Sequence, residues 1–215
     1  MESIPTEPPA GILFDFDGTL LDSMHTCHIG ICHVCSRLGG RLPTLDYVLK
    51  YFHPPFVDAY RILGVTADLK RIAAVYFEVV DHRNDYLFAD VIPNLSELFL
   101  RDVRTGIISA NTDTIIRHHC NSNGRQLGEL LHYAKGSSAK KAIDIRFFCK
   151  EHYLSPGDVW VVGDARSDVR AAREAGCVAV GITRGNPTES VLMESGAHFC
   201  VRDLNDLSAF ISQIG

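Results

Sequence analysis

Six short apolar runs, separated by segments with helical periodicity, restrict the folds that this chain can adopt. Several runs are apolar almost without interruption, which is typical of parallel strands buried on both faces of a sheet. Because strand and helix alternate along the chain, the pattern predicts a doubly wound α/β fold with a mostly parallel sheet. The predicted strands are 12–16, 105–109, 131–134, 159–162, 178–182 and 198–201, and the predicted helices are 94–100, 114–122, 139–152, 167–175, 189–195 and 204–214.

The interval 22–92 interrupts this alternation directly after the first strand. It has the pattern of four helices, at 24–38, 45–51, 56–63 and 67–86, and Thr66 is a candidate N-cap for the last of them. A length of 215 residues suits one domain that carries a smaller insertion. We therefore expect an α/β core domain of residues 1–21 and 93–215, with residues 22–92 inserted as an all-helical domain.

Charge and hydropathy exclude several classes of protein. The formal net charge of −5 argues against a nucleic-acid-binding protein with a basic patch. The N-terminus lacks a basic segment followed by an apolar run, so we expect no secretory signal. No apolar stretch approaches the ~18 residues that span a bilayer, so we expect no membrane segment. These features favour a cytoplasmic protein, and they leave open whether it is a monomer or a homodimer.

The cysteines and histidines do not form a zinc-binding pattern. Cys32 and Cys35 make a CxxC pair, but a structural zinc site needs a second ligand pair downstream and none follows. We expect the seven cysteines to be free thiols, largely buried, as in most cytosolic proteins. His118, His119 and His132 are expected on the surface or in loops.

Polar residues follow four of the predicted strands, at the point where each strand ends. The carboxyl ends of parallel strands meet at one edge of a sheet, and ligands of open α/β sheets bind there. Buried carboxylates are costly unless they are paired or bind a metal, and Mg²⁺ prefers such oxygen ligands. An aspartate can also attack phosphorus as a nucleophile. In strand order, the residues are Asp15 and Asp17; Ser109 and Asn111; Lys135, Lys140 and Lys141; and Asp164 and Asp168.

The motifs DFDGTLLDS, SANT, a lysine and GDARSD, in this order, resemble the haloacid dehalogenase-like (HAD) hydrolase superfamily. The resemblance covers essentially the whole chain. It is strongest to the phosphoglycolate-phosphatase-like branch, because of LLDS, a Pro–Pro loop and LSPGDVWVVGD. The resemblance implies a Rossmann-like core and a helical cap of the C1 type. It also implies a Mg²⁺-dependent phosphatase that hydrolyses a small phosphorylated metabolite through an aspartyl-phosphate.

The resemblance also implies roles for individual residues. Asp15 would be the nucleophile, and Asp17 would protonate the leaving group and then deprotonate water. Magnesium would be held by Asp15, by the main-chain carbonyl of Asp17 and by Asp164, with Asp168 beside it or bound through water. Gly18 would let backbone N–H groups face the phosphate, and Ser109, assisted by Asn111, would bind a phosphoryl oxygen.

The lysine that neutralises the phosphate is left open by the sequence. The family spacing counted back from Asp164 ends close to Lys140, which also precedes a helix N-terminus, where phosphate binds well. We prefer Lys140, with Lys135 next, and Lys141 lies one residue away. The branch normally has a lysine–proline pair, which is replaced here by KGSSAKK.

Substrate selection is expected to depend on the helical insertion, where His53, Arg61 and Arg83 are candidates for contacts to the substrate. Arg166 is expected to face solvent or the cap.

Three other functions are possible for a chain with these motifs. A phosphomutase of the β-phosphoglucomutase type tends to have two adjacent acids at the fourth motif, but here Gly163 precedes Asp164. A dehalogenase is disfavoured by Asp17. A non-catalytic partner-binding protein would not need acids at one edge of the sheet.

Overall fold

The computed structural model describes residues 4–52, 55–122, 126–138 and 140–215 of the chain. Two compact units can be distinguished. One contains the residues up to Leu21 together with Leu87–Gly215, and the other is Asp22–Tyr86. His53, a candidate for substrate binding, lies outside the described residues.

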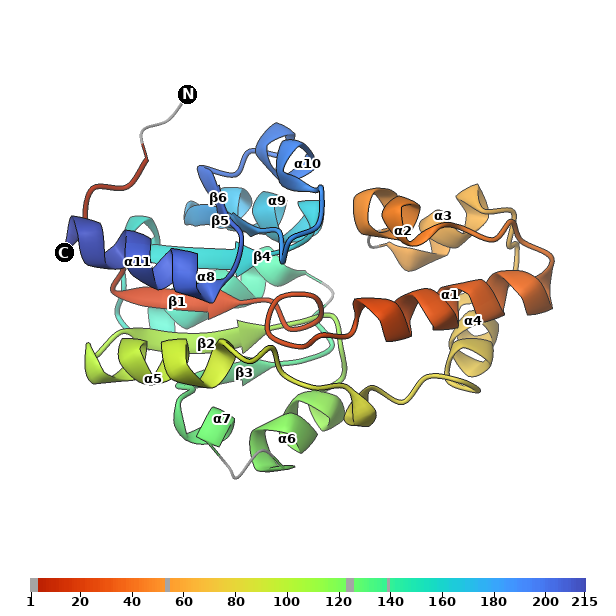
Figure 1. Ribbon diagram of the computed structural model, residues 1–215, viewed down its shortest axis with the longest axis horizontal. Helices are drawn as coiled ribbons and strands as arrows, with labels where there is room; N and C mark the ends of the chain where they lie inside the picture. Colours follow the sequence, from red (N-terminus) through yellow and green to blue (C-terminus); the bar gives the residue numbers. More distant parts are fainter. Residues whose placement is uncertain (1–3, 53–54, 123–125, 139) are drawn as a thin grey trace. The chain divides into compact units, whose positions relative to one another are not determined.

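The first unit is built on a sheet of six parallel strands in the order β3-β2-β1-β4-β5-β6 (Figure 1). The central strand β1 pairs with β2 on one side and β4 on the other, so Gly11 lies opposite both Arg104 and Val159. The predicted doubly wound α/β fold is confirmed. The strands are β1 Gly11–Phe14, β2 Arg104–Ile108, β3 Tyr133–Lys135, β4 Val159–Gly163, β5 Val178–Ile182 and β6 Phe199–Val201.

Helices cover both faces of this sheet. On β1, Ile12 and Phe14 pack in the hydrophobic cluster that includes α5, α6 and α11, whereas Leu13 packs in the cluster of α8, α9 and α10. This alternation explains why the strand has apolar residues at every position. The helices are α5 Val91–Leu100, α6 Asp113–Ser122, α7 Gln126–Glu129, α8 Lys141–Glu151, α9 Arg166–Ala175, α10 Glu189–Glu194 and α11 Leu204–Ile214.

The second unit is helical and has its own hydrophobic cluster, which includes Ile31 and Val34 of α1 and Ile72 and Val75 of α4. Gly30 allows close packing within this unit, because a Cβ there would lie 2.4 Å from the Tyr76 ring. The elements are α1 Met24–Leu38, α2 Leu45–Tyr51, α3 Phe56–Ile62, α4 Leu69–Tyr76 and a 3₁₀ turn at His82–Asn84.

Two predicted helices differ from the structure by three residues or more at one end, and one short α-helix was not predicted. The predicted helix 67–86 is wrong in its second half: α4 is capped by Asp68 rather than Thr66 and ends at Tyr76. The Asp81 side chain then accepts a hydrogen bond from the backbone N–H of Arg83, a local contact that competes with helix formation. Helix α5 begins three residues before the predicted start, with a proline in its first turn where no backbone donor is lost. The short α7 was not predicted.

All seven cysteines are free thiols, as predicted, but three of them are buried and four are half-buried, so their predicted burial is confirmed only in part. His119 is buried and packs against the Phe16 ring, with 5.6 Å between ring centroids, so its predicted surface position is wrong. Within the described ranges, no helix has the length and apolarity needed to cross a membrane.

Candidate active site

The loop after β1 places its two aspartates at the carboxyl edge of the sheet. Asp15 continues the β1 pairing, since its N–H donates to the carbonyl of Val162 on β4 at 2.9 Å. Gly18 then turns the chain with a φ of +71°, a conformation that residues with a side chain rarely adopt. A Cβ at Gly18 would lie 2.5 Å from the Asp164 carboxylate. Glycine is therefore required both for the turn and for the close approach of the loop to Asp164.

Three carboxylates gather at this edge around one ammonium group. Asp15 follows β1, Asp164 follows β4, and Asp168 lies in the first turn of α9, with one oxygen of each within 4.8 Å of the others. Lys141 Nζ lies 2.8 Å from Asp15 Oδ1 and 2.6 Å from Asp168 Oδ1. One positive charge thus faces three acids, so the cluster carries an excess of negative charge when all the acids are ionised.

Burial and mutual repulsion shift the protonation of this cluster. Burial, reinforced by the charge of Asp168, raises the pKa of Asp15 to about 7, although Lys141 opposes the change. Burial also raises the pKa of Asp164 well above its usual range, and Asp15 adds to the effect. For Lys141, burial would lower the pKa, but the charges of Asp15 and Asp168 outweigh it and raise the value. Lys141 therefore stays protonated, while two of the acids need a further positive partner.

The donor set fits a hard divalent cation. Asp15 Oδ1 is buried and lies within ion-pair distance of Lys141, yet it receives no well-formed hydrogen bond from any described residue. Asp168 is already engaged through both oxygens, because Lys141 and the Ala165 N–H donate to it at 2.6 and 3.1 Å. Asp15 and Asp164 are consequently the carboxylates best able to bind a metal, with Asp168 beside them.

The structure favours Lys141 over the preferred Lys140 as the lysine of the cluster. Lys140 is the exposed N-cap residue of α8, and Lys135 is exposed on β3. Lys141 begins the helix, and its side chain is only 14% exposed. One residue along a helix turns the side chain by about 100°. An error of one residue in the family spacing therefore selects a side chain that points away from the acids.

The end of β2 contributes a second set of contacts. Asn111 Nδ2 donates to both carboxylate oxygens of Asp17, at 3.2 and 3.0 Å. The buried Ser109 hydroxyl accepts a hydrogen bond from the Asn111 N–H at 3.0 Å, which leaves its own hydrogen available for donation to a ligand. Asn111 thus fixes the carboxylate of Asp17, and Ser109 is oriented by the same turn.

Other residues named from the sequence have local partners. Arg61 pairs with Asp58, and Arg83 pairs with Asp81. Arg166 lies 3.8 Å from Glu194.

Thr19, which was not predicted as a site residue, also contacts the cluster. The Thr19 hydroxyl donates to Asp164 Oδ1 at 3.1 Å. The position of Thr19 within the motif DFDGT was a signal that could have identified it.

Comparisons with known proteins place nearly the whole chain beside phosphatases and hydrolases. Phosphoglycolate phosphatase of Synechococcus elongatus is 26% identical over 207 residues, which cover 94% of this chain and 97% of the relative. Tyrosine-protein kinase PtkA of Mycobacterium tuberculosis is 25% identical over 186 residues, which cover 81% of this chain and 62% of the kinase. A haloacid dehalogenase-like family hydrolase from Streptococcus pneumoniae shares the fold, with a TM-score of 0.77, 21% identity and coverage of 96% and 99%.

The family model described as haloacid dehalogenase-like hydrolase matches residues 12–182. This match contains the ends of β1, β2 and β4, with every acid of the cluster, and the lysine at the start of α8. The chain is therefore a hydrolase that belongs to the haloacid dehalogenase-like family.

Proposed function

We propose that this chain is a Mg²⁺-dependent phosphatase that hydrolyses a small organic phosphomonoester through an aspartyl-phosphate on Asp15. The observation that carries the proposal is the cluster of Asp15, Asp164 and Asp168 around Lys141 at the carboxyl edge of the sheet. Similarity to phosphoglycolate phosphatase over nearly the whole chain supports a phosphorylated small molecule as substrate.

Asp15, Asp164 and the main-chain carbonyl of Asp17 would hold the magnesium ion. The metal would supply positive charge that allows an anionic nucleophile and an anionic phosphate to approach each other. The acidic excess of the cluster and the buried Asp15 Oδ1 support this assignment.

The side chains of the protein perform the two displacements. An oxygen of Asp15 forms a bond to phosphorus while the ester P–O bond breaks, and Asp17 gives its proton to the leaving oxygen. Water then attacks phosphorus, Asp17 takes a proton from it, and the P–O bond to Asp15 breaks to release inorganic phosphate. Lys141 and the Ser109 hydroxyl would stabilise charge on the phosphoryl oxygens. Asn111, which donates to both oxygens of Asp17, keeps that carboxylate oriented.

The helical unit Asp22–Tyr86 would act as the cap of this enzyme. A cap that opens and closes admits substrate and then excludes water from the reacting groups. In this assignment the choice of substrate depends on residues of the helical unit, while the sheet unit supplies the chemistry.

The test is release of inorganic phosphate from p-nitrophenyl phosphate and from phosphoglycolate, with Mg²⁺ and with EDTA. We expect activity only with Mg²⁺, loss of activity in Asp15→Asn, and an aspartyl-phosphate that can be trapped on Asp15 by borohydride reduction and mass spectrometry. Absence of Mg²⁺-dependent hydrolysis, or an Asp15→Asn variant as active as the wild type, would refute the proposal.

Two neighbouring lysines provide a matched pair of variants. Lys141→Ala removes the ammonium group that contacts Asp15 and should lower kcat by a factor on the order of 100. Lys140→Ala removes an exposed charge one residue away and should leave kcat nearly unchanged. If instead Lys140→Ala lowers kcat and Lys141→Ala does not, Lys140 is the lysine that binds the phosphate.

A further inference from the structure

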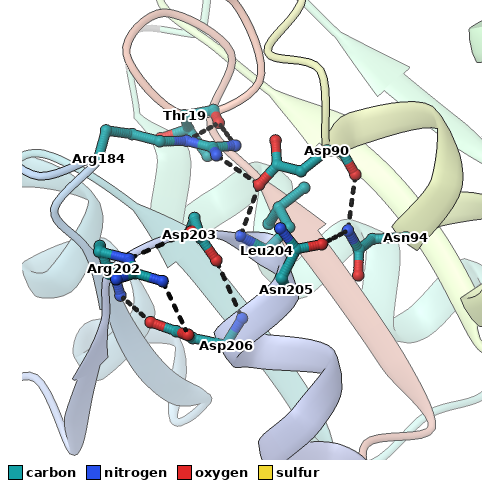
Figure 2. A network of polar contacts seen from close by, with 9 residues as sticks. All are labelled: Thr19, Asp90, Asn94, Arg184, Arg202, Asp203, Leu204, Asn205 and Asp206. Carbon is teal, nitrogen blue, oxygen red and sulfur yellow. Dashed lines mark hydrogen bonds and ion pairs between the residues drawn. The ribbon is translucent and has the colours of Figure 1, made fainter.

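A network of polar contacts in the sheet unit is centred on Arg184 and is joined to the acidic cluster through Thr19 (Figure 2). Arg184 lies two residues after the end of β5 and has a φ of +51°, which is uncommon for a residue with a long side chain. Its backbone N–H donates to the carbonyl of Arg202 at 2.8 Å, which fixes the turn. This backbone conformation directs the guanidinium inward, where the side chain is only 5% exposed.

The guanidinium of Arg184 is held by three different groups. Its Nε and Nη2 both donate to the main-chain carbonyl of Thr19, at 3.0 and 2.5 Å. Its Nη1 donates to Asp90 Oδ2 at 2.6 Å. The Phe88 ring lies below the cation, with 4.1 Å from the guanidinium carbon to the ring centroid. A planar fork of N–H donors can make these contacts together, which a lysine ammonium cannot do.

Asp90 anchors this arginine to the rest of the unit. The same carboxylate oxygen also accepts the N–H of Leu204, at the start of α11, at 2.8 Å. The Asp90 carbonyl accepts a hydrogen bond from the Asn94 side chain, which in turn donates to Asn205. Figure 2 shows Leu204 of α11 contacting the carboxylate that faces Arg184, while Asn94 of α5 contacts the main-chain carbonyl of the same Asp90. The guanidinium therefore has a rigid base on one side and the Thr19 carbonyl on the other.

Thr19 connects Arg184 to the acidic cluster. Its carbonyl is held by Arg184, and its hydroxyl donates to Asp164 Oδ1 at 3.1 Å. Thr19 also directly follows Gly18, whose position against Asp164 leaves no space for a Cβ. A shift of the Thr19 backbone would therefore move the loop that carries Asp15 and Asp17 and would release the carboxylate of Asp164.

We propose that Arg184 is a positioning residue of this site: by holding the Thr19 carbonyl, it orients Asp164 for the metal and keeps the loop of the nucleophile in place. The proposal rests on the proposed phosphatase function. Arg184 and Asp90 are far apart in the sequence and lie outside the four motifs that carry the family resemblance.

The test compares Arg184→Lys with the wild type. Lysine keeps the charge opposite Asp90 but loses the paired N–H contacts to the Thr19 carbonyl. We expect kcat for p-nitrophenyl phosphate to fall about tenfold with little change in KM, because residues that orient metal ligands typically contribute tenfold or more. We also expect the Mg²⁺ concentration at the midpoint of thermal stabilisation to rise about tenfold, a readout that does not depend on activity.

Two further variants separate positioning from general stability. Thr19→Val removes the hydroxyl that donates a hydrogen bond to Asp164 and should reproduce both effects. The double variant Arg184→Lys/Thr19→Val should be no worse than either single variant, because both substitutions act on Asp164 through Thr19. Arg202→Lys is the matched control, since Arg202 is an exposed arginine of the same network that contacts Asp203 and Asp206 (Figure 2). It should keep the wild-type kcat and Mg²⁺ midpoint.

The outcomes are distinguishable. If Arg184→Lys only lowers the melting temperature, while kcat and the Mg²⁺ midpoint match the wild type, the positioning role is refuted and the proposed function stands. Multiplicative effects in the double variant would refute the path through Thr19. A wild-type protein with neither Mg²⁺-dependent hydrolysis nor thermal stabilisation by Mg²⁺ would overturn the proposed function, and this inference with it.

Discussion

Replacement of Asp164 by asparagine should stabilise the metal-free protein and at the same time abolish its response to Mg²⁺. One carboxylate oxygen of each of Asp15, Asp164 and Asp168 lies within 4.8 Å of the others, with Lys141 as their nearby cation. At an effective dielectric constant of about 20, two like charges at this distance repel each other by roughly 3 kcal/mol. Asp164 has two such neighbours, and its attraction to Lys141 offsets about one of these repulsions, so roughly 3 kcal/mol remains.

Part of this repulsion is already relieved, because the raised pKa of Asp164 favours its protonated form in the folded protein. We therefore expect Asp164→Asn to increase the free energy of unfolding by about 2 kcal/mol at neutral pH, or about 4–8 °C in melting temperature for a chain of this size. Asparagine keeps an oxygen that can accept the hydrogen bond from Thr19.

The assay is thermal unfolding followed by circular dichroism at low ionic strength, in EDTA and in saturating MgCl₂. In EDTA the variant should melt above the wild type. With Mg²⁺ at about 100 times its dissociation constant, the wild type should gain about 2.7 kcal/mol and the variant almost nothing, so their order reverses. Asp102→Asn, a change at a side chain 85% exposed outside the cluster, is the control and should alter neither curve. A variant that melts below the wild type in EDTA, or that Mg²⁺ stabilises equally, would refute the electrostatic reasoning.

Three other substitutions test the fold around the site. Gly18→Ala should lower kcat at least tenfold and weaken Mg²⁺ binding, because its Cβ would lie 2.5 Å from Asp164; near-normal kinetics would show that the loop tolerates a shift. Phe148→Ala, at a fully buried side chain of α8, should cost about 3–5 kcal/mol in urea unfolding, and a loss below about 1 kcal/mol would contradict the packing. Burial and the neighbouring Arg104 lower the pKa of His132 from 6.5, so the unfolded chain binds a proton that the folded chain excludes, and stability should fall as the pH drops below 6.5. His132→Asn, which retains an acceptor for the Thr105 N–H, should reduce this fall, and an unchanged pH dependence would exclude His132 as its source.

The parallel sheet could be predicted because the side chains of a central strand alternate between two hydrophobic clusters, one on each face of the sheet. Ile12 and Phe14 face one cluster and Leu13 the other, so the strand is apolar at every position and stands out from the amphipathic helices. The end of α4 could not be predicted in the same way. Val80 continues the apolar spacing and is buried, but it lies beyond the helix, and periodicity records burial rather than backbone conformation.

The acids of the site could be located because every parallel strand delivers its last residues to the same edge. Asp15 and Asp164 lie far apart in the sequence, yet β1 and β4 are neighbours in register. The lysine could not be fixed in the same way, because the choice between Lys140 and Lys141 depends on where α8 begins, to within one residue. Arg184 left no signal, because its contact is with the main-chain carbonyl of Thr19, which is the same for every residue type.

Stability and function make opposite demands at this edge of the sheet. Asp164 is unfavourable in the metal-free protein, and Gly18 is held at a positive φ beside it. These features persist because both faces of the sheet are packed and because Arg184, held by Asp90, fixes the adjoining loop through the Thr19 carbonyl. Replacement of Asp164 would consequently stabilise the metal-free protein, but the variant would lose the negative charge that metal binding needs. The same unfavourable arrangement of charges is therefore an indication of function.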